Sequence, residues 1–460
     1  MRYDKLAAIT GGTLYNTEAI TKIFTGVGID SRTIGKDQLF VAIKGERTDG
    51  HKYIKSALKN GASGLLVEYN YPSLDMLPGN IPVVSVMDSH KAMMLLAKEY
   101  RNTIDARFIG ITGSNGKTTT KEILYSLLNA LETGVYKSPG NLNNLFGVPL
   151  AMFGIPTGCN LAVFEMGIST KHEMPKLAEM VRPDIAVLTN IGPSHLAYLS
   201  SVEEVAQAKL EIIKHSGKNI PVVINADDKV LFNEAHKACS HVVTFGFNAE
   251  ADFHPDKFDI DENGSSHVVI ENNNFKLKLP GKHQVYNLLA GYAVCRSLGY
   301  GFENVDTAAI EFDTAPMRGQ KIELGEITFI SDCYNANPAS VKVGLEAFFS
   351  IPTHKQRVII LGDMLELGSD ASRYHKEIGR LLSQFDFDRA ILVGTLSINY
   401  RIGGVERGLP LDKFIHFDTA VNAAKEIKSI LKHGQIVYLK GSRGIGLERI
   451  LEVFQPGGEK

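Results

Sequence analysis

The chain has 460 residues, of which 44% are hydrophobic and 22% charged, values that are ordinary for a soluble protein of about three domains. A net charge of −2 gives no basic field for nucleic acid, and no apolar run is long enough for a signal peptide or a membrane span. Its four cysteines lack a Cys-x-x-Cys pair, which argues against a disulfide framework or structural zinc, so we expect a cytoplasmic protein.

Three units follow one another along the chain. Residues 1–84 form a small unit that ends in a Pro/Gly-rich stretch, 71–82, which is typical of a linker. Residues 85–313 alternate short β-branched runs with helical patterns. The strands expected there are 108–112, 161–164, 185–189 and 222–225. This alternation predicts βαβ units and a mostly parallel sheet.

The pattern changes between about 243 and 280, where residues 267–279, with Glu271-Asn-Asn-Asn274 as the turn, predict a β-hairpin appended to that sheet. Residues 314–460 alternate strands and helices again. The strands expected there are 328–330, 358–361, 390–393 and 436–439. The sequence therefore predicts an α/β protein with three domains.

The most specific motif is Gly113-Ser-Asn-Gly-Lys-Thr118, between the strand at 108–112 and a helix with an apolar stripe. Gly113 and Gly116 permit a tight turn whose backbone N–H groups point at one anion, and Lys117 adds a positive charge. Thr118 offers a hydroxyl to Mg²⁺, and the helix N-terminus adds partial positive charge. A nucleoside triphosphate site is predicted here, in a short form with Ile111 at the position of the usual first glycine.

Other polar motifs also follow predicted strands of both α/β units. They begin at Glu165, Asn190, Asn225, Asp332, Gly362 and Lys440. Because ligands bind at the carboxyl ends of strands in open α/β sheets, we expect an active site in a cleft between two domains.

Two of these residues could bind metal. Glu165, beside the phosphate loop, could hold Mg²⁺ by oxygen ligation, or it could be an ordinary strand-end carboxylate in solvent. His195 lies in a Gly-Pro-Ser turn and could contact metal or phosphate, although a lone histidine there is more often a surface or capping residue.

Lys209 lies on the apolar stripe of a helix that the capping box Ser201-Val-Glu-Glu204 begins. One interpretation is a lysine that extends its ammonium along the stem to water. The other is a buried amine with a depressed pKa, neutral enough to react with CO₂ and become a carbamate that could bind Mg²⁺.

Together these motifs resemble the Mur ligase family along the whole chain. The resemblance implies a UDP-sugar-binding N-terminal domain, a central ATP-binding domain with a P-loop and a Rossmann-like C-terminal domain that binds the incoming amine. It implies that ATP contacts Gly113, Ser114, Asn115, Gly116, Lys117, Thr118, Thr119, Asn287, Arg318 and Asp332. It places catalytic or Mg²⁺-binding roles on Lys117, Thr118, Glu165, His195 and carbamylated Lys209.

The resemblance also implies the other two substrates. UDP-N-acetylmuramoyl-tripeptide would contact Asp30, Ser31, Arg32, Phe40, Gly45, Asp49, His51, Asn141, Asn143 and Asn144. D-Ala-D-Ala would contact Tyr334, Asn335 and Asn337, since the segment Tyr334-Asn-Ala-Asn-Pro338 resembles the members that add this dipeptide. Three segments depart from the family pattern: the pair Leu145-Phe146, Leu210 and Ser331.

The implied enzyme is a monomeric ATP-dependent ligase that uses ATP and two Mg²⁺ ions in peptidoglycan precursor synthesis, through an acyl phosphate. One alternative is a folylpolyglutamate synthase, against which the segment 30–51 argues, because that family begins directly with the ATP-binding domain. The other is a P-loop nucleotide switch without ligation.

Overall fold

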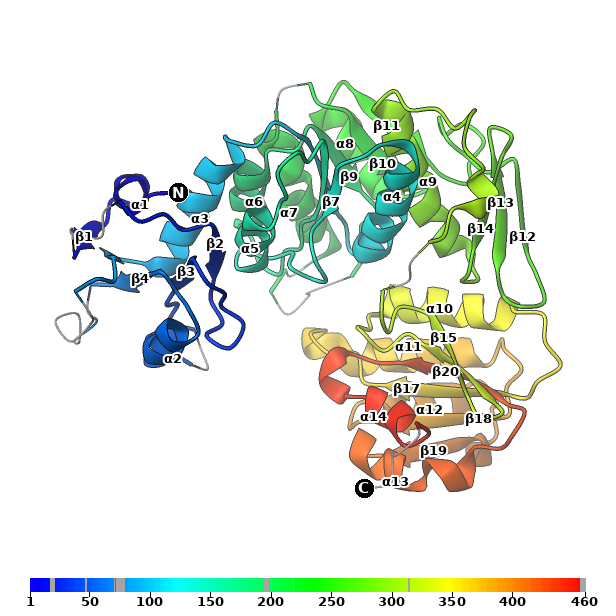
Figure 1. Ribbon diagram of the computed structural model, residues 1–460. Helices are drawn as coiled ribbons and strands as arrows, with labels where there is room; N and C mark the ends of the chain where they lie inside the picture. The colour runs from blue at the N-terminus through cyan, green and yellow to red at the C-terminus, as the bar shows by residue number, and fades with distance from the viewer. Residues whose placement is uncertain are drawn as a thin grey trace.

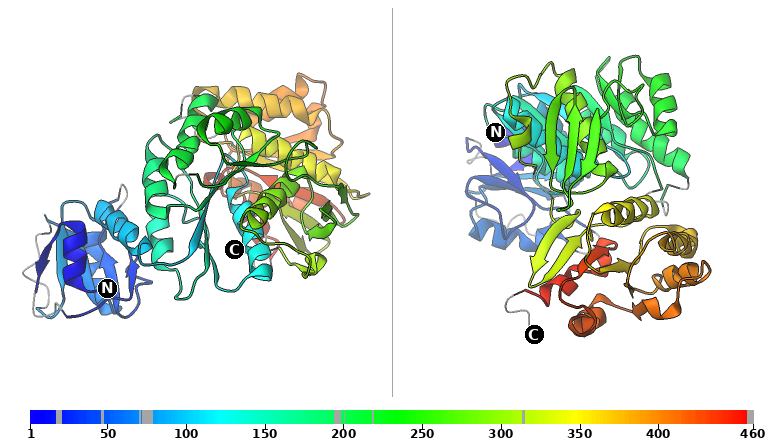
Figure 2. Two further views of the ribbon diagram at one scale, coloured as in Figure 1. Left: turned by 90° about the horizontal axis from the view of Figure 1, so that it is seen from above. Right: turned by 90° about the vertical axis from the view of Figure 1, so that its right-hand side faces the viewer.

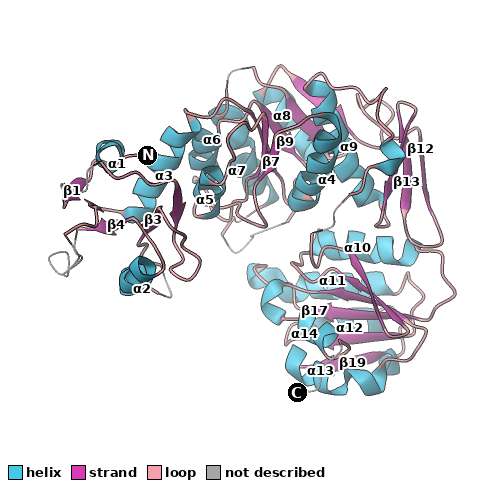
Figure 3. Ribbon diagram, in the orientation of Figure 1, coloured by secondary structure: helices cyan, strands magenta, loops and turns pink. Residues whose placement is uncertain are grey.

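The computed structural model describes residues 1–16, 21–45, 48–69, 71, 79–193, 198, 199, 201–217, 219–312 and 315–455. These residues form three α/β domains, with the central domain between the N-terminal and C-terminal ones (Figures 1 and 2). Strands and helices alternate through most of the chain, as expected (Figure 3). Among the described residues, no helix has the length and apolarity that a membrane crossing requires.

The N-terminal domain is a five-stranded sheet in the order β1-β5-β4-β3-β2, parallel except for β1. Its strands are β1 (Thr13–Tyr15), β2 (Gly26–Gly28), β3 (Gln38–Val41), β4 (Gly64–Glu68) and β5 (Val83–Val86). Its helices are α1 (Tyr3–Thr10), the 3₁₀ helix η2 (Gly50–Tyr53) and α2 (Ile54–Lys59). Because β5 pairs with β4, this sheet extends two residues past the boundary expected at 84.

Helix α3 (Ser89–Arg101) connects the first two domains. Asp88 caps it by accepting a hydrogen bond from the Lys91 N–H at 2.8 Å. Its buried face packs on α1 of the N-terminal domain and on α5 (Gly147–Phe153) and α6 (Glu173–Val181) of the central domain. The helix therefore belongs to the cores of both domains.

The central sheet is fully parallel, in the order β11-β10-β9-β6-β8-β7. Its strands are β6 (Arg107–Thr112), β7 (Val135–Lys137), β8 (Leu161–Glu165), β9 (Ile185–Leu188), β10 (Val222–Asn225) and β11 (Val242–Phe245), which confirms the four expected strands. One face is covered by α4 (Lys117–Leu131) and α9 (Lys282–Ser297). The other is covered by α3, α5, α6, α7 (Val202–His215) and α8 (Lys229–Ala238).

The expected hairpin is formed by β13 (Ser266–Ile270) and β14 (Asn273–Leu277), with Glu271 and Asn272 at positive φ in the turn. It joins β12 (Lys257–Ile260) in a separate three-stranded antiparallel sheet and does not extend the parallel one. The reason is that Val268, Ile270 and Phe275 pack into the core around α9.

The C-terminal sheet has the order β15-β16-β20-β17-β18-β19, parallel except for β15. Its strands are β15 (Gln320–Leu324), β16 (Ile327–Ser331), β17 (Arg357–Gly362), β18 (Arg389–Val393), β19 (Phe414–Phe417) and β20 (Ile436–Lys440), which include all four expected ones. Its α-helices are α10 (Pro338–Ser350), α11 (Ala371–Leu382), α12 (Ile398–Val405), α13 (Ala420–Ile430) and α14 (Glu448–Glu452). This domain also has the short 3₁₀ helices η5 (Gly368–Asp370), η6 (Leu411–Lys413) and η7 (Arg443–Ile445), whereas η4 (Thr307–Ala309) packs against β14 of the central domain.

Alternate residues of each C-terminal strand face opposite helical layers. Ile359 and Leu361 of β17 pack with α10, α11 and α12, whereas Val358 and Ile360 pack with α13 and α14. Helix α10 lies on the side of this domain that meets the central domain (Figure 1). The domain boundary expected at 313/314 falls on residues outside the described ranges.

Candidate active site

The phosphate loop connects β6 to α4, as the motif predicts. Gly113 and Gly116 have φ of 143° and 84°, which favour glycine. A Cβ at Gly113 would lie 1.9 Å from the Thr189 hydroxyl, and one at Gly116 would lie 2.5 Å from the Asn287 carboxamide oxygen. Both glycines are therefore required by backbone conformation and by space. Lys117 folds over the loop, where its Nζ donates to the Gly113 carbonyl at 2.8 Å.

The end of β9 holds this loop from the side. The Asn190 carboxamide makes two bonds to the Asn115 peptide: its Oδ1 accepts from the Asn115 N–H at 2.9 Å and its Nδ2 donates to the Asn115 carbonyl at 3.1 Å. Thr189 Oγ1 donates to the same carbonyl at 2.6 Å. The Ser114 hydroxyl donates to the Gly192 carbonyl. Asn190 begins one of the polar motifs, but its hydrogen bonds to the phosphate loop could not be predicted from the sequence.

Thr118 and Glu165 meet at the carboxyl ends of β6 and β8. Thr118 Oγ1 donates to Glu165 Oε2 at 2.7 Å, and Asn143 Nδ2 donates to Glu165 Oε1 at 2.7 Å. Glu165 is only 2% exposed, so it is not an ordinary carboxylate in solvent. A hydroxyl beside a buried carboxylate is an oxygen donor set that fits Mg²⁺.

Lys121, on α4, is absent from the residues that the sequence motifs indicate. Its side chain is fully buried, and its Nζ donates to the carbonyls of Ser138 and Gly140 at 2.8 and 2.7 Å. It thereby holds the chain that leads to Asn143. The signal was available, because Lys121 lies three residues before Leu124 on an apolar stripe, as Lys209 lies three before Ile212.

Lys209 lies on α7, which begins as expected with the Ser201 hydroxyl accepting from the Glu204 N–H at 3.2 Å. Only 1% of Lys209 is exposed, so the interpretation of an ammonium that extends to water does not hold. Burial, assisted by the positive charge of Lys117, lowers the pKa of Lys209 well below its ordinary value. Burial therefore shifts the equilibrium of Lys209 towards the neutral amine. His195 lies outside the described residues.

Three further residues expected to contact nucleotide lie around the phosphate loop. Asn287 Oδ1, on α9, accepts from the Thr120 hydroxyl at 3.1 Å, one residue after Thr119 in the first turn of α4. Arg318 stacks on the Tyr334 ring, with its guanidinium carbon 4.0 Å from the ring centroid. Burial lowers the pKa of Lys117, the charge of Glu165 opposes this, and the charge of Arg318 adds a smaller lowering effect. Arg318 thus acts electrostatically on the phosphate loop from the C-terminal domain.

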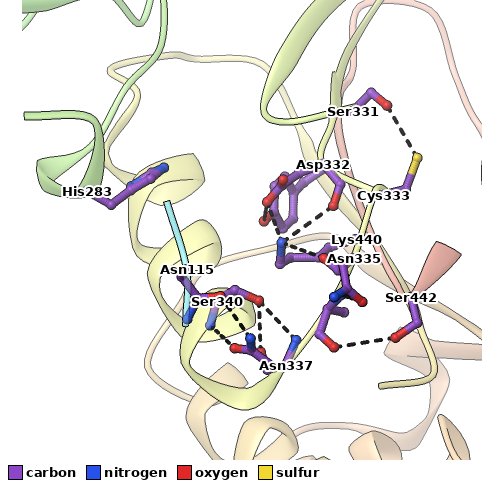
Figure 4. A network of polar contacts seen from close by, with 12 residues as sticks. Asn115, His283, Ser331, Asp332, Cys333, Asn335, Asn337, Ser340, Lys440 and Ser442 are labelled. Atoms are coloured by element: carbon purple, nitrogen blue, oxygen red, sulfur yellow. Dashed lines mark hydrogen bonds and ion pairs between the residues drawn. The ribbon is translucent and has the colours of Figure 1, made fainter. Parts of the chain in front are cut away.

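Asp332 is held in an ion pair with Lys440. The Lys440 ammonium lies 2.7 Å from Asp332 Oδ2, which also accepts from the Tyr438 hydroxyl at 2.9 Å (Figure 4). Lys440 donates in addition to the Asn335 carbonyl at 3.2 Å. The pair therefore fixes the loop that carries the residues expected to bind the amine. Ser331, which departs from the family pattern, is buried next to Asp332 in the chain, and its hydroxyl lies 3.4 Å from Cys333 Sγ.

The two asparagines of that loop differ. Asn335 is exposed, and its Oδ1 accepts only the neighbouring Ala336 N–H among the bonds observed. Asn337 is 8% exposed and caps α10: its Oδ1 accepts from the Ser340 N–H at 2.8 Å. Its Nδ2 donates to Asn115 Oδ1 of the phosphate loop at 2.8 Å (Figure 4). The structure thus brings the C-terminal loop into contact with the phosphate loop, through a residue expected to contact dipeptide.

The motif that begins at Gly362 builds the neighbouring loops. The buried Asp363 carboxylate accepts from the Ser397 N–H at 2.7 Å, before α12. Ser442 Oγ accepts from the Leu365 N–H at 2.9 Å and contacts the Ala336 carbonyl at 3.4 Å. Ser442 therefore links three strand-end loops of the C-terminal domain.

In the N-terminal domain, several residues expected to contact substrate are held by the protein itself. His51 Nδ1 lies 2.7 Å from Asp49 Oδ1, and its Nε2 accepts from the Glu68 N–H at 3.0 Å, which orients the ring. Phe40 is in the core, Ser31 is buried, and the Gly45 N–H donates to the Thr48 carbonyl at 2.9 Å. The Arg32 side chain is 84% exposed, and it lowers the pKa of Asp30 to about 2 through its hydrogen bonds. Arg32 is thus the exposed cation among these residues.

The asparagine-rich loop, residues 140–144, and the two residues that follow it lie against α3. Asn141 is exposed, and Asn144 Oδ1 accepts from the Gly147 N–H at 2.9 Å where α5 begins. The departure at Leu145-Phe146 makes this contact: the Phe146 ring stacks on His90, with centroids 3.8 Å apart, and the Leu145 carbonyl lies 3.0 Å from His90 Nε2. The departure at Leu210 is buried in the central core.

Comparisons with known proteins cover nearly the whole chain. Three family descriptions match successive parts: "Mur ligase family, catalytic domain" at 23–101, "Mur ligase middle domain" at 111–295 and "Mur ligase, glutamate ligase domain" at 317–443. The UDP-N-acetylmuramoyl-tripeptide–D-alanyl-D-alanine ligase of Bacillus subtilis is 34% identical over 97% of this chain and 96% of its own. That of Escherichia coli is 30% identical over 94% of each chain.

Solved structures agree with these relatives. MurF from Acinetobacter baumannii superimposes with a TM-score of 0.86 at 26% identity, over 98% of both chains. MurF ligase from Thermotoga maritima in complex with ADP gives 0.80 at 30% identity, over 93% of this chain and 96% of that one. A folylpolyglutamate synthase of Mycobacterium tuberculosis shares the fold at 16% identity, over 80% of this chain and 95% of its own, with a TM-score of 0.62.

Proposed function

The chain belongs to the Mur ligase family, and we propose that it is the ATP-dependent ligase that joins D-Ala-D-Ala to UDP-N-acetylmuramoyl-tripeptide in cytoplasmic peptidoglycan synthesis. Relatives named for this activity match nearly its full length. The observation that carries the proposal is the 2.8 Å contact between Asn337 and Asn115, since it brings the expected amine-binding loop onto the phosphate loop.

The residues divide the chemistry between two domains. The loop amides and Lys117 bind the β- and γ-phosphates of ATP, and the terminal carboxylate of the tripeptide attacks the γ-phosphorus to give an acyl phosphate and ADP. The amine of D-Ala-D-Ala then attacks the acyl carbon, an amide bond forms, and inorganic phosphate and a proton leave. The protein contributes positioning and charge stabilisation to both steps.

We propose that Thr118 and Glu165 hold one Mg²⁺, because their oxygens lie together in a buried site. Bound Mg²⁺ supplies positive charge that offsets the negative charge of the phosphates. The buried carboxylate needs this ion or a cation such as Lys117 beside it, because an isolated buried charge is costly.

We also propose that Lys209 is carbamylated and, with His195, holds a second Mg²⁺. Support comes from the burial of Lys209, which lowers the pKa of its amine and so favours the neutral, nucleophilic form. In carbamylation, Nζ attacks the carbon of CO₂ and loses one proton, which turns a neutral amine into an anion. Such an anion offers Mg²⁺ the oxygen ligands that it prefers.

The experiment is a phosphate-release assay with the purified protein. The lysine-containing and diaminopimelate-containing tripeptides are each tested with and without D-Ala-D-Ala. We expect phosphate release that requires ATP, one of the tripeptides and the dipeptide together. Turnover of ATP alone would favour a nucleotide switch, and turnover with a folate and L-glutamate would favour folylpolyglutamate synthase. Gel filtration of the same sample tests the monomeric state.

A further inference from the structure

Asn337 uses both ends of its carboxamide. Its oxygen accepts from the Ser340 N–H at the start of α10, while its Nδ2 donates to Asn115 Oδ1 in another domain (Figure 4). Its backbone N–H donates to the Ser340 hydroxyl at 3.0 Å, which completes a capping box. The amide orientation is therefore fixed by the helix, so its donor points at the phosphate loop.

Asn115 is equally constrained on its side of the contact. Its peptide group is bonded to Asn190 and Thr189 of the central domain, so its side chain follows the conformation of the phosphate loop. The neighbouring residues Gly116 and Lys117 are those expected to surround the phosphates. A change in this loop would consequently move the acceptor that Asn337 meets.

The rest of the amine-binding loop is held by residues at the end of β20. Lys440 fixes the Asn335 carbonyl and the Asp332 carboxylate, and Ser442 contacts the carbonyl of Ala336, the residue before Asn337. Asn335 and Asn337 are two residues apart, so a displacement of one shifts the other. The bond between Asn115 and Asn337 thus joins the loop expected to bind ATP to the loop expected to bind the amine.

We infer that Asn337 is a positioning residue that sets the amine-binding loop against the phosphate loop through Asn115, so that the amine meets the acyl phosphate in a reactive geometry. The inference rests on the proposed ligase function. Its physical basis is that a small misplacement of two reacting groups lowers the rate strongly, whereas ground-state binding of ATP needs no such alignment. A hydrogen bond between neutral amides corresponds to about a five-fold effect.

The test is a double-mutant cycle with Asn337→Ser, Asn115→Ala and the double variant. Serine caps helices as well as asparagine does, but it is too short to reach Asn115, so Asn337→Ser removes the contact and keeps the cap. Thr419→Ala is the matched control, because Thr419 caps α13 through the Asn422 N–H and belongs to no expected site. Each variant is assayed for kcat, for KM of D-Ala-D-Ala and for binding of a non-hydrolysable ATP analogue by calorimetry.

We expect Asn337→Ser and Asn115→Ala each to lower kcat/KM for D-Ala-D-Ala about five-fold, with analogue binding by Asn337→Ser within about two-fold of wild type. The double variant should also lose about five-fold, because both changes remove one bond. Independent losses that multiply to about 25-fold, or wild-type kinetics in Asn337→Ser, would overturn the inference. Thr419→Ala should keep wild-type kinetics; if it loses as much as Asn337→Ser, the loss reflects helix capping and the inference fails.

A catalysis-free measurement separates this inference from the proposed function. If the wild-type protein ligates no amine, the proposed function is wrong. Small-angle X-ray scattering with the ATP analogue then tests the link by itself. We expect a larger radius of gyration for Asn337→Ser than for wild type, because the C-terminal domain loses a tie to the phosphate loop. Equal radii would overturn the inference.

Discussion

The hydroxyl of Thr118 lies 2.7 Å from the buried carboxylate of Glu165, which joins the first turn of α4 to the end of β8. Glu165→Gln keeps the shape of this side chain and an oxygen that can accept from Thr118, but it removes the negative charge. We expect a folded enzyme whose kcat falls by about 10²-fold or more, because the proposed Mg²⁺ loses a charged ligand. Steady-state kinetics across a range of Mg²⁺ concentrations measure this. An unchanged kcat with an unchanged Mg²⁺ requirement would contradict it.

Lys121 holds the chain that leads into the asparagine-rich loop by hydrogen bonds to two of its carbonyl groups. Lys121→Met keeps the apolar stem and leaves the carbonyls of Ser138 and Gly140 without their donor. We expect the free energy of unfolding to fall by about 1–3 kcal/mol and KM for the UDP-tripeptide to rise, since Asn143 loses its support. Urea denaturation and steady-state kinetics measure the two effects.

The control for Lys121 is Lys137→Met. Lys121 and Lys137 both form an ion pair with Glu122. Lys137 is half-buried, however, and it bonds to neither of the loop carbonyls that Lys121 holds. This variant should keep a near-normal KM for the UDP-tripeptide. If both variants change that KM equally, the effect comes from Glu122 and not from the loop.

Lys209→Ala should be inactive, and short carboxylates such as acetate should partly restore turnover by filling the proposed ligand position. The reason is that burial lowers the pKa of this amine, which favours the neutral form that carbamylation requires. Lys214→Ala, at an exposed lysine on the same helix, serves as the control and should keep full activity. A high-resolution map with Mg²⁺ and ATP bound that shows a plain amine at Lys209 would refute the carbamate.

His283 makes stability depend on pH. His283 is the second residue of α9, Asp332 and Lys440 of the C-terminal domain face it (Figure 4), and its Nδ1 has no hydrogen-bond partner among the described residues. Burial lowers the pKa of His283 from 6.5 to about 4; the charge of Asp332 opposes this and that of Lys440 adds to it. Between these values the unfolded chain binds a proton that the folded chain does not, so this contribution to stability is lost as the pH falls from 6.5 towards 4.

His283→Gln should weaken this dependence, because glutamine stays neutral. Urea unfolding at pH 7, 5.5 and 4.5 measures it: the free energy of unfolding of the wild type should fall more steeply than that of the variant. His433→Gln, at a histidine whose side chain is 83% exposed, should behave as wild type. Parallel pH profiles for wild type and His283→Gln would contradict the prediction.

The sequence predicts most of the fold because buried strands leave a local signal. All eight expected strands are present, and the hairpin forms around the turn expected at 271–274, although Asn273 and Asn274 belong to β14. Its separate sheet was not predictable, since side-chain packing on α9 decides it. The pairing of Thr118 with Glu165 agrees with the rule that strand ends converge. The contact between Asn115 and Asn337 spans 222 residues and depends on how two domains meet, so residue spacing carries no trace of it.

Specificity for the amine should depend on the loop that carries Tyr334 and Asn335. Asn335 is exposed, whereas Asn337 is 8% exposed and bonded at both ends of its amide, so Asn335 is the more accessible of the two asparagines expected to contact the dipeptide. The loop offers amide and phenol groups without added charge, which suits a small dipeptide better than a free charged side chain. A site built on hydrogen bonds rejects ligands that leave those groups unpaired by large factors.

We therefore expect strong preference for D-Ala-D-Ala over L-Ala-L-Ala, free D-Ala and free L-glutamate, measured in a competition assay with all four amines at equal concentration. Asn335→Ala should raise KM for the dipeptide about five-fold while KM for ATP stays near its wild-type value, because Asn335 makes no contact with the phosphate loop among the bonds observed. Asn337→Ser should instead lower the rate of the coupled reaction, which separates ligand contact from positioning. If L-glutamate were consumed as fast as D-Ala-D-Ala, the folylpolyglutamate synthase alternative would be favoured, because a loop without added charge should not accept a charged side chain equally well.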